Sequence, residues 1–175
     1  MFSESKKNNK NGFSLMELMI VIAIIGIMTS IVLVYSGKNK IEKEVEGAAR
    51  EVAAAIREAQ NNALTGKQPE AGKFPCAYIF SATNDSENYG IQYAYHFSAE
   101  NDCALYEPKS YASYSLKNGV KFSTGNDTGI SFNIPWGTAA GSIDSPIVLT
   151  KGSSSYTICV NSAGRVTETK GESCP

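Results

Sequence analysis

Histidine is almost absent from this sequence, and the cysteines are widely spaced. The 175 residues contain one histidine, His96, and four cysteines, none of them in a Cys-x-x-Cys pair. A nucleophilic triad needs a base and an orienting acid, and a zinc site needs several converging ligands. Asp85, Glu87 and Asp102 lack the Asp-x-Asp-x-Asp-Gly spacing of a calcium loop. We therefore expect no enzymatic activity, metal or other cofactor.

An excess of charge of either sign is also missing. The chain has 16 Lys and Arg against 17 Asp and Glu, a formal net charge of -1. No basic field would draw it onto nucleic acid, which is therefore not expected as the main partner. No internal repeat of about 20–50 residues is visible, which excludes solenoids and propellers.

The hydrophobicity that is present concentrates in one run near the N-terminus. Leu18 to Gly37 are 20 consecutive residues without a charge. At a rise of about 1.5 Å per residue, a helix of this length spans about 30 Å, the hydrocarbon thickness of a bilayer. Glu17 stands at the edge of the run, and a carboxylate costs about 2.5–3.5 kcal/mol at the centre of a membrane helix. The run predicts a membrane-crossing helix, and Glu17 calls for a partner or a function.

The four cysteines, Cys76, Cys103, Cys159 and Cys174, all follow this run. An even number downstream of a membrane-directed segment favours disulfides in an oxidising compartment, with buried free thiols as the rival interpretation. Three pairings are open. We favour Cys76–Cys103 and Cys159–Cys174 because both close locally.

The residues at the start of the run carry a resemblance. The stretch from Gly12 to Ile27 reads GFSLMELMIVIAIIGI, which resembles the N-terminal signature of type IV pilins and type II secretion pseudopilins. The resemblance implies that a membrane-embedded prepilin peptidase cuts between Gly12 and Phe13 and methylates the new amine of Phe13. It also implies that Glu17 pairs with that amine of a neighbouring subunit during assembly.

Together with the hydropathy, the resemblance divides the chain into four parts. These are a leader at 1–12, a transmembrane and assembly helix at 13–37, an amphipathic continuation at 38–66 and a β-rich head at 67–175. The implied partners are other pilin subunits, the peptidase and an inner-membrane assembly platform. The implied location is the bacterial inner membrane, crossed once with the head outside the cytoplasm, and later a cell-surface or periplasmic filament.

Apolar residues after the run recur at spacings of three and four, which predicts an amphipathic helix. The stripe consists of Ile41, Val45, Ala48, Ala49, Val52, Ile56, Ala59, Ala63 and Leu64. Glu46 and Arg50 stand at i, i+4 outside it and predict an ion pair worth about 0.2–0.5 kcal/mol. Gly66 and Pro69 indicate a helix end near Thr65-Gly66. A coiled coil is the rival, but the stripe is short and alanine-rich, so we favour packing against a sheet.

From Phe74 onward, short β-prone runs alternate with turn residues, which predicts an antiparallel sheet or sandwich. The expected strands are Ala77–Phe80, Tyr89–Phe97, Tyr111–Leu116, Gly119–Ser123, Gly129–Ile134, Ile147–Thr150, Tyr156–Asn161 and Arg165–Thr169. Asn118-Gly119 and Ala163-Gly164 are typical of hairpin turns. The fold class is therefore α+β, a long N-terminal helix packed on an antiparallel head.

The head resembles the GspH/FimT group of minor pseudopilins and minor pilins. The residues that carry this likeness are Ile130 to Gly137, Ile147 to Leu149, Tyr156 to Asn161 and Gly164 to Val166. It implies two β-sheets beside the amphipathic end of the helix, and a structural subunit of the minor kind.

A DNA-binding minor pilin of an uptake pilus is the alternative function. Some members of the group bind DNA through a Gly-Arg-x-Arg turn, whereas this chain reads Gly164-Arg165-Val166-Thr167, with one arginine. Loss of residues 1–12, which carry a net +2, changes the formal charge from -1 to -3, and this opposes binding dominated by phosphates. Arg165 is thus a candidate for a weak DNA contact only.

Overall fold

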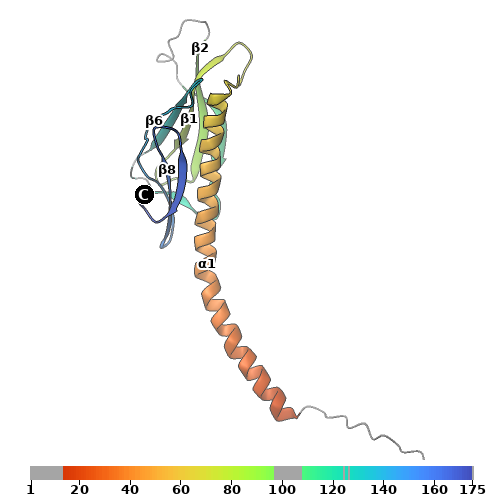
Figure 1. Ribbon diagram of the computed structural model, residues 1–175. Helices are drawn as coiled ribbons and strands as arrows, with labels where there is room; N and C mark the ends of the chain where they lie inside the picture. Colours follow the sequence, from red (N-terminus) through yellow and green to blue (C-terminus); the bar gives the residue numbers. More distant parts are fainter. Residues whose placement is uncertain (1–13, 97–107, 124, 126, 175) are drawn as a thin grey trace, which may run out of the picture. The chain divides into compact units, whose positions relative to one another are not determined.

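A computed structural model of the protein describes residues 14–96, 108–123, 125 and 127–174, with the side chains of 31–38 and 96 left out. The chain divides into two units, Met1–Asn39 and Lys40–Pro175. Helix α1 (Leu15–Leu64) begins in the first unit and ends in the second (Figure 1).

The second-unit part of α1 carries the predicted amphipathic stripe. Its fully buried members are Val45, Ala49, Val52, Ile56, Ala59 and Ala63. The predicted pair on the exposed side is also confirmed, with Arg50 Nη2 2.5 Å from Glu46 Oε1. Because the helix presents an alanine-rich face, it can approach the strands closely, and packing against a sheet is the correct interpretation.

The predicted helix end is confirmed and forms a Schellman cap. Gly66 adopts a φ of 58°, its N–H donates to the Ala63 carbonyl at 3.2 Å, and the N–H of Lys67 donates to the Asn62 carbonyl at 3.0 Å. This left-handed position favours glycine. The prediction that Leu64 belongs to the buried stripe is wrong: it is 51% exposed, because this last helical residue covers Gly137 instead of entering the core.

The described part of the head contains nine strands. They are β1 (Phe74–Ala82), β2 (Asn88–His96), β3 (Lys109–Ser115), β4 (Lys121–Phe122), β5 (Thr128–Asn133), β6 (Ala139–Gly141), β7 (Ile147–Lys151), β8 (Ser154–Val160) and β9 (Val166–Lys170). One sheet has the order β3-β2-β1-β5-β6 and the other β4-β7-β8-β9. All their ladders are antiparallel, so the predicted α+β class with an antiparallel head is confirmed.

The eight predicted strands are present with shifted ends, although the predicted end at Phe97 lies outside the described residues. Strand β6 was missed because three small residues give no alternating pattern. Of the two predicted hairpins, Ala163-Gly164 is confirmed, since it joins the paired strands β8 and β9. The Asn118-Gly119 prediction is wrong in one respect. The turn forms, with φ values of 61° and 70°, but β3 and β4 belong to different sheets, so it carries the chain from one sheet to the other.

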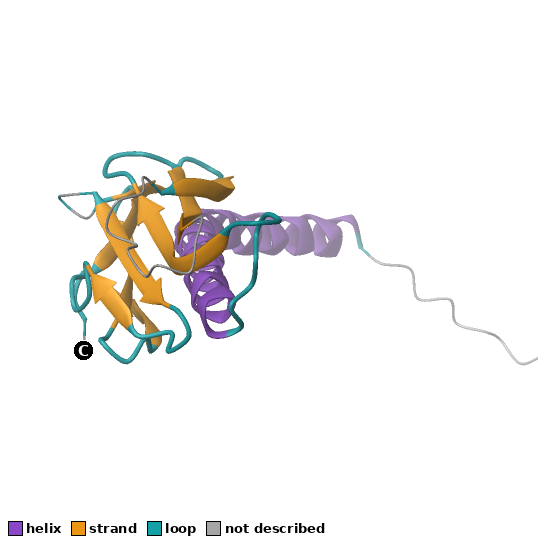
Figure 2. Ribbon diagram, turned by 90° about the horizontal axis from the view of Figure 1, so that it is seen from above, coloured by secondary structure: helices purple, strands orange, loops and turns teal. Residues whose placement is uncertain are grey.

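Both sheets and the helix share one hydrophobic core. On β1, Tyr78, Phe80 and Ala82 are buried while the residues between them are partly exposed, which is the alternation expected of a sheet covered on one face. Leu149 and Ile158 of the other sheet join the same cluster as Val52 of the helix. Figures 1 and 2 show the C-terminal part of α1 running alongside the strands.

Candidate functional site

The described helix of the first unit has an apolar surface on every side. Its exposed large side chains are Leu15, Met16, Leu18, Met19, Ile20, Val21, Ile22, Ile24, Ile25, Ile27 and Met28. They range from 45% exposed at Val21 to 76% at Leu15. Soluble monomers rarely expose a contiguous apolar surface of this kind, so such a surface marks a site that packs against other apolar groups.

The few polar side chains of this segment are satisfied within the helix. The Thr29 hydroxyl donates to the Ile25 carbonyl at 2.7 Å, and the Ser30 hydroxyl donates to the Gly26 carbonyl at 2.8 Å. A hydroxyl that bonds one turn back leaves no donor without a partner when the helix enters surroundings free of water. Both residues are therefore compatible with burial among lipids or other helices.

Glu17 is the one charged residue between Ser14 and Ser30. It lies in the first turn of α1 and is exposed, and the positive end of the helix dipole favours an anion there. No ion pair of Glu17 is found among the described residues. Its carboxylate is thus available to a cation from outside this segment.

Two expectations for this region remain predictions. The cleavage junction Gly12–Phe13, with the methylation of Phe13, lies outside the described residues. The membrane-crossing helix expected at 13–37 also remains a prediction. Within the described part of the chain, no helix is both long enough and apolar enough to span a membrane.

Ion pairs between distant parts of the second unit join α1 to the head. The pairs are Arg57–Glu168 at 2.9 Å, Lys151–Glu44 at 2.6 Å and Lys170–Glu42 at 2.6 Å. The hydrogen bond from Lys151 lowers the pKa of Glu44, and the bond to Glu42 raises the pKa of Lys170. Sequence reasoning missed these pairs because their partners lie more than 100 residues apart, beyond any local spacing rule.

A second charged cluster centres on Glu70, in the loop between α1 and β1. Its carboxylate accepts hydrogen bonds from Lys109 at 2.6 Å, Lys73 at 2.5 Å and the buried phenol of Tyr93 at 3.0 Å. The bonds from Lys109, then Lys73, then Tyr93 lower the pKa of Glu70 to about 2. The cluster thus ties this loop to strands β2 and β3 through one carboxylate.

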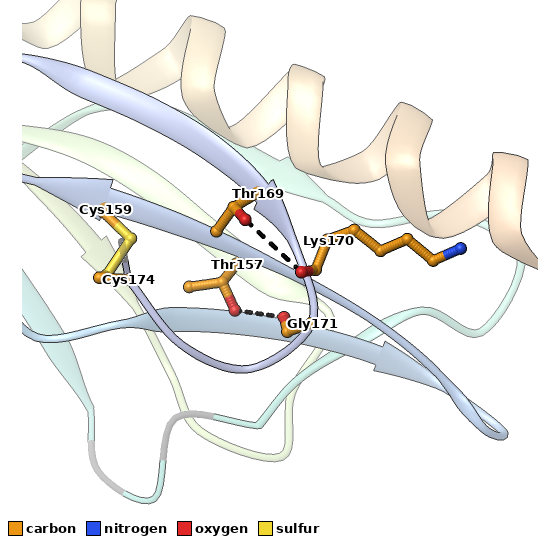
Figure 3. The surroundings of a disulfide bond; sticks show 6 residues. All are labelled: Thr157, Cys159, Thr169, Lys170, Gly171 and Cys174. Carbon is orange, nitrogen blue, oxygen red and sulfur yellow. Dashed lines mark hydrogen bonds between the residues drawn. A yellow bond between two sulfur atoms is a disulfide. The ribbon is translucent and has the colours of Figure 1, made fainter.

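The C-terminal end of the head is closed by the predicted disulfide Cys159–Cys174 (Figure 3). Beside it, the fully buried Thr157 donates its hydroxyl to the Gly171 carbonyl at 2.6 Å. None of the described cysteines is a free thiol. The expected pairing of Cys76 with Cys103 cannot be placed, since Cys103 lies outside the described residues.

Arg165 lies next to this disulfide on the β8–β9 turn. It is exposed, and its N–H donates to Asn161 Oδ1 at 2.9 Å. Arg165 lines a cleft of about 400 Å³ together with Asp144, Cys159, Val160, Asn161, Thr167 and Cys174. One arginine facing a cleft that also holds Asp144 does not make a basic surface of the kind that binds phosphates.

Residues 7–33 match the family model of the prokaryotic N-terminal methylation motif. No curated protein and no solved structure matches the chain. The motif supports a precursor of the type IV pilin kind, which is processed by a prepilin peptidase and assembles with other pilins. It also supports a membrane-anchored precursor that later enters a surface or periplasmic filament. The likeness of the head to the GspH/FimT group gains no support from these comparisons.

Proposed function

We propose that this protein is a structural subunit of a type IV pilus or a type II secretion pseudopilus, cut after Gly12 and N-methylated at Phe13. The observation that carries the proposal is the overlap of the methylation motif with the exposed apolar helix of α1. That helix is apolar all round apart from Glu17, so it suits a membrane before assembly and a bundle of like helices afterwards.

Glu17 sets the axial register between neighbouring subunits during assembly. Its carboxylate has no partner in its own described segment, and a buried charge without a partner is strongly destabilising. The methylated amine of Phe13 from a neighbouring subunit is cationic and can neutralise it inside the apolar bundle. Subunits out of register would leave both charges unpaired, so the pair selects a single axial offset.

The subunit is of the minor kind, in the manner of GspH/FimT heads. Support comes from the two antiparallel sheets beside the amphipathic end of α1, which is the arrangement that the resemblance implies. Before assembly, residues 13–37 hold the precursor in the inner membrane with the head outside the cytoplasm, where the Cys159–Cys174 disulfide is compatible with an oxidising compartment.

Processing is tested by co-expressing the full chain with a prepilin peptidase and weighing the intact product by mass spectrometry. We expect a product that begins at methylated Phe13, while the matched variant Gly12→Val keeps residues 1–12. An unprocessed wild-type chain beside a correctly processed reference prepilin would contradict the proposal.

The minor role is tested by quantifying the chain in sheared filaments, and it is wrong if this chain is the main subunit.

DNA capture is the second candidate, and the exposed Arg165, which forms no ion pair in the described part of the chain, is the feature that favours it. Titration of duplex DNA with the full chain in detergent, over a range of salt concentrations, tests it. Salt-sensitive binding that is weakened by Arg165→Ala would favour DNA capture over the purely structural function. Absence of such binding would favour the structural function.

A further inference from the structure

A groove runs along the exposed side of α1 in the second unit. It is lined by Glu51, Ala54, Ala55, Glu58, Tyr89, Tyr114 and Lys117 and has a volume of about 340 Å³. Glu51 and Glu58 are seven residues apart, so they lie on one helix face about 10 Å from each other. The small side chains of Ala54 and Ala55 between them leave room for a group from outside.

Two stacked tyrosines form the opposite wall. The rings of Tyr89 and Tyr114 are 5.2 Å apart at an interplanar angle of 25°, and the Tyr114 hydroxyl donates to Glu58 Oε2 at 3.2 Å. Tyr89 is only 8% exposed. Burial and the nearby charge of Glu51 raise the pKa of Tyr89 to about 12, so the groove holds a neutral phenol between two carboxylates.

The groove carries two carboxylates and one lysine, Lys117. Glu58 also acts on Lys67, whose pKa is raised mainly by its hydrogen bond to Tyr111 and in smaller part by the charge of Glu58. In the described part of the chain, neither Glu51 nor Glu58 forms an ion pair, and Lys117 at the end of the groove reaches neither of them. Carboxylates beside an aromatic face fit a guanidinium, which forms paired hydrogen bonds with a carboxylate and stacks on a tyrosine ring.

The chain itself offers one suitable arginine. Of its three arginines, Arg50 pairs with Glu46 and Arg57 pairs with Glu168. Arg165 is exposed and has no ion pair among the described residues, and the Asn161 side chain holds its turn in place. Charge complementarity therefore points to Arg165 as the group that fits the groove.

Arg165 of the same molecule does not face the groove. Its neighbour Gly164 lies against Gln60, and its other neighbour Val166 accepts a hydrogen bond from Arg57. At about 100° per residue, Arg57 and Gln60 project roughly 100–180° around α1 from Glu51 and Glu58. The arginine and the groove thus occupy opposite flanks of one helix.

We propose that the groove binds Arg165 of a second copy of this chain, in a head-to-tail contact. In a pair joined in this way, one copy still has a free groove and the other still has a free Arg165. Further copies can therefore be added at either end through the same contact. The contact rests on the proposed function insofar as a filament brings two copies side by side. It requires only that two copies be adjacent, so it fits a subunit of low abundance.

The test uses two full-length copies with different tags, co-expressed and co-purified from membranes. We expect Arg165→Glu in both copies to reduce co-purification about tenfold. The matched change Lys121→Glu, at an exposed basic residue elsewhere in the head, should leave it unchanged. Adding Glu51→Lys and Glu58→Lys to the Arg165→Glu protein in both copies should restore the contact, because every groove is then basic and every position 165 is acidic. Equal co-purification of the Arg165→Glu and Lys121→Glu proteins would overturn the proposal.

A photo-crosslinking residue at Ala54 identifies the occupant directly. We expect a crosslinked peptide that contains Arg165 of the other copy, and a crosslink to another protein or to Lys117 of the same copy would overturn the assignment. An intact Cys159–Cys174 disulfide and an unchanged melting temperature serve as the control for folding. Because these assays score contact between heads and not cleavage at Gly12, their failure is distinguishable from failure of the proposed function.

Discussion

The guanidinium of Arg57 lies 2.9 Å from the carboxylate of Glu168 and joins the middle of α1 to the last strand of the head. The two residues are 111 positions apart in the chain. Arg57 also donates to the Val166 carbonyl at 3.4 Å, so one side chain holds β9 at two points. The end of the chain is thus fixed to the helix as well as to Cys159.

Replacing Arg57 by methionine should lower the free energy of unfolding by about 0.2–1 kcal/mol. The magnitude is small because the Arg57 side chain is 51% exposed and solvent screens the pair. Urea unfolding of the full chain in detergent measures the loss. Arg50→Met, which removes an ion pair inside the helix, is the matched control and should leave hydrogen exchange of the β9 amides unchanged, whereas Arg57→Met should speed it.

The carboxylate of Glu70 makes the stability of the head depend on pH. Its pKa is about 2 in the folded protein against an ordinary value of 4.5, so its contribution is present above pH 4.5 and is lost as the pH falls towards 2. The melting temperature of wild type should therefore exceed that of Glu70→Gln near neutral pH, and the two should converge over that interval. Tyr93→Phe, which removes one of the three hydrogen bonds, should reduce the difference without abolishing it.

A constant difference between wild type and Glu70→Gln from pH 6 to pH 2 would contradict this role. The comparison must use the change with pH, since either variant also alters packing of the loop in a manner independent of pH.

Local patterns in the sequence were sufficient for most of the fold. The stripe from Val45 to Ala63 follows from helical spacing, and the end of α1 follows from Gly66, because short-range hydrogen bonds and one buried face determine both. Leu64 departed from the stripe because Gly137, far along the chain, supplies its contact. Periodicity contains no information about such a partner.

Sequence reasoning reached the N-terminal signature but not the surfaces of the head. Glu17 could be singled out because a charge beside an apolar run is costly wherever the run goes. The groove could not, because it joins Glu58 to Tyr114 across 56 positions. Asn118-Gly119 failed as a hairpin for the same reason, since the turn residues fix its geometry but not the sheet that β4 enters.

Alanine substitutions at Gly137 and Gly152 distinguish the cost of a strained backbone from the cost of a steric collision. Their φ values are 62° and 59°, so alanine at either should cost about 1–2 kcal/mol for the left-handed backbone. A Cβ at Gly137 would also meet Leu64 Cδ2 at 2.6 Å, whereas nothing lies within 4 Å at Gly152. Gly137→Ala should therefore destabilise more than Gly152→Ala in thermal unfolding.

The collision is tested by relieving it. Adding Leu64→Ala should bring the loss caused by Gly137→Ala down to that of Gly152→Ala, because Leu64 is half exposed and its removal opens no internal cavity. An equal loss at the two glycines without Leu64→Ala would show that the leucine moves aside freely.

Removal of the Glu17 carboxylate should separate processing from assembly. In Glu17→Ala the peptidase junction at Gly12 is intact, so cleavage and methylation should proceed as in wild type, as mass spectrometry of the membrane-bound protein would show. Incorporation into sheared filaments should fall at least tenfold, because the amine of Phe13 would enter an apolar bundle with no carboxylate to neutralise it. Glu17→Asp keeps the charge on a shorter side chain and should recover part of the incorporation, whereas Glu17→Gln should not. If Glu17→Gln assembled as well as wild type, a hydrogen bond and not a charge pair would set the register of the filament.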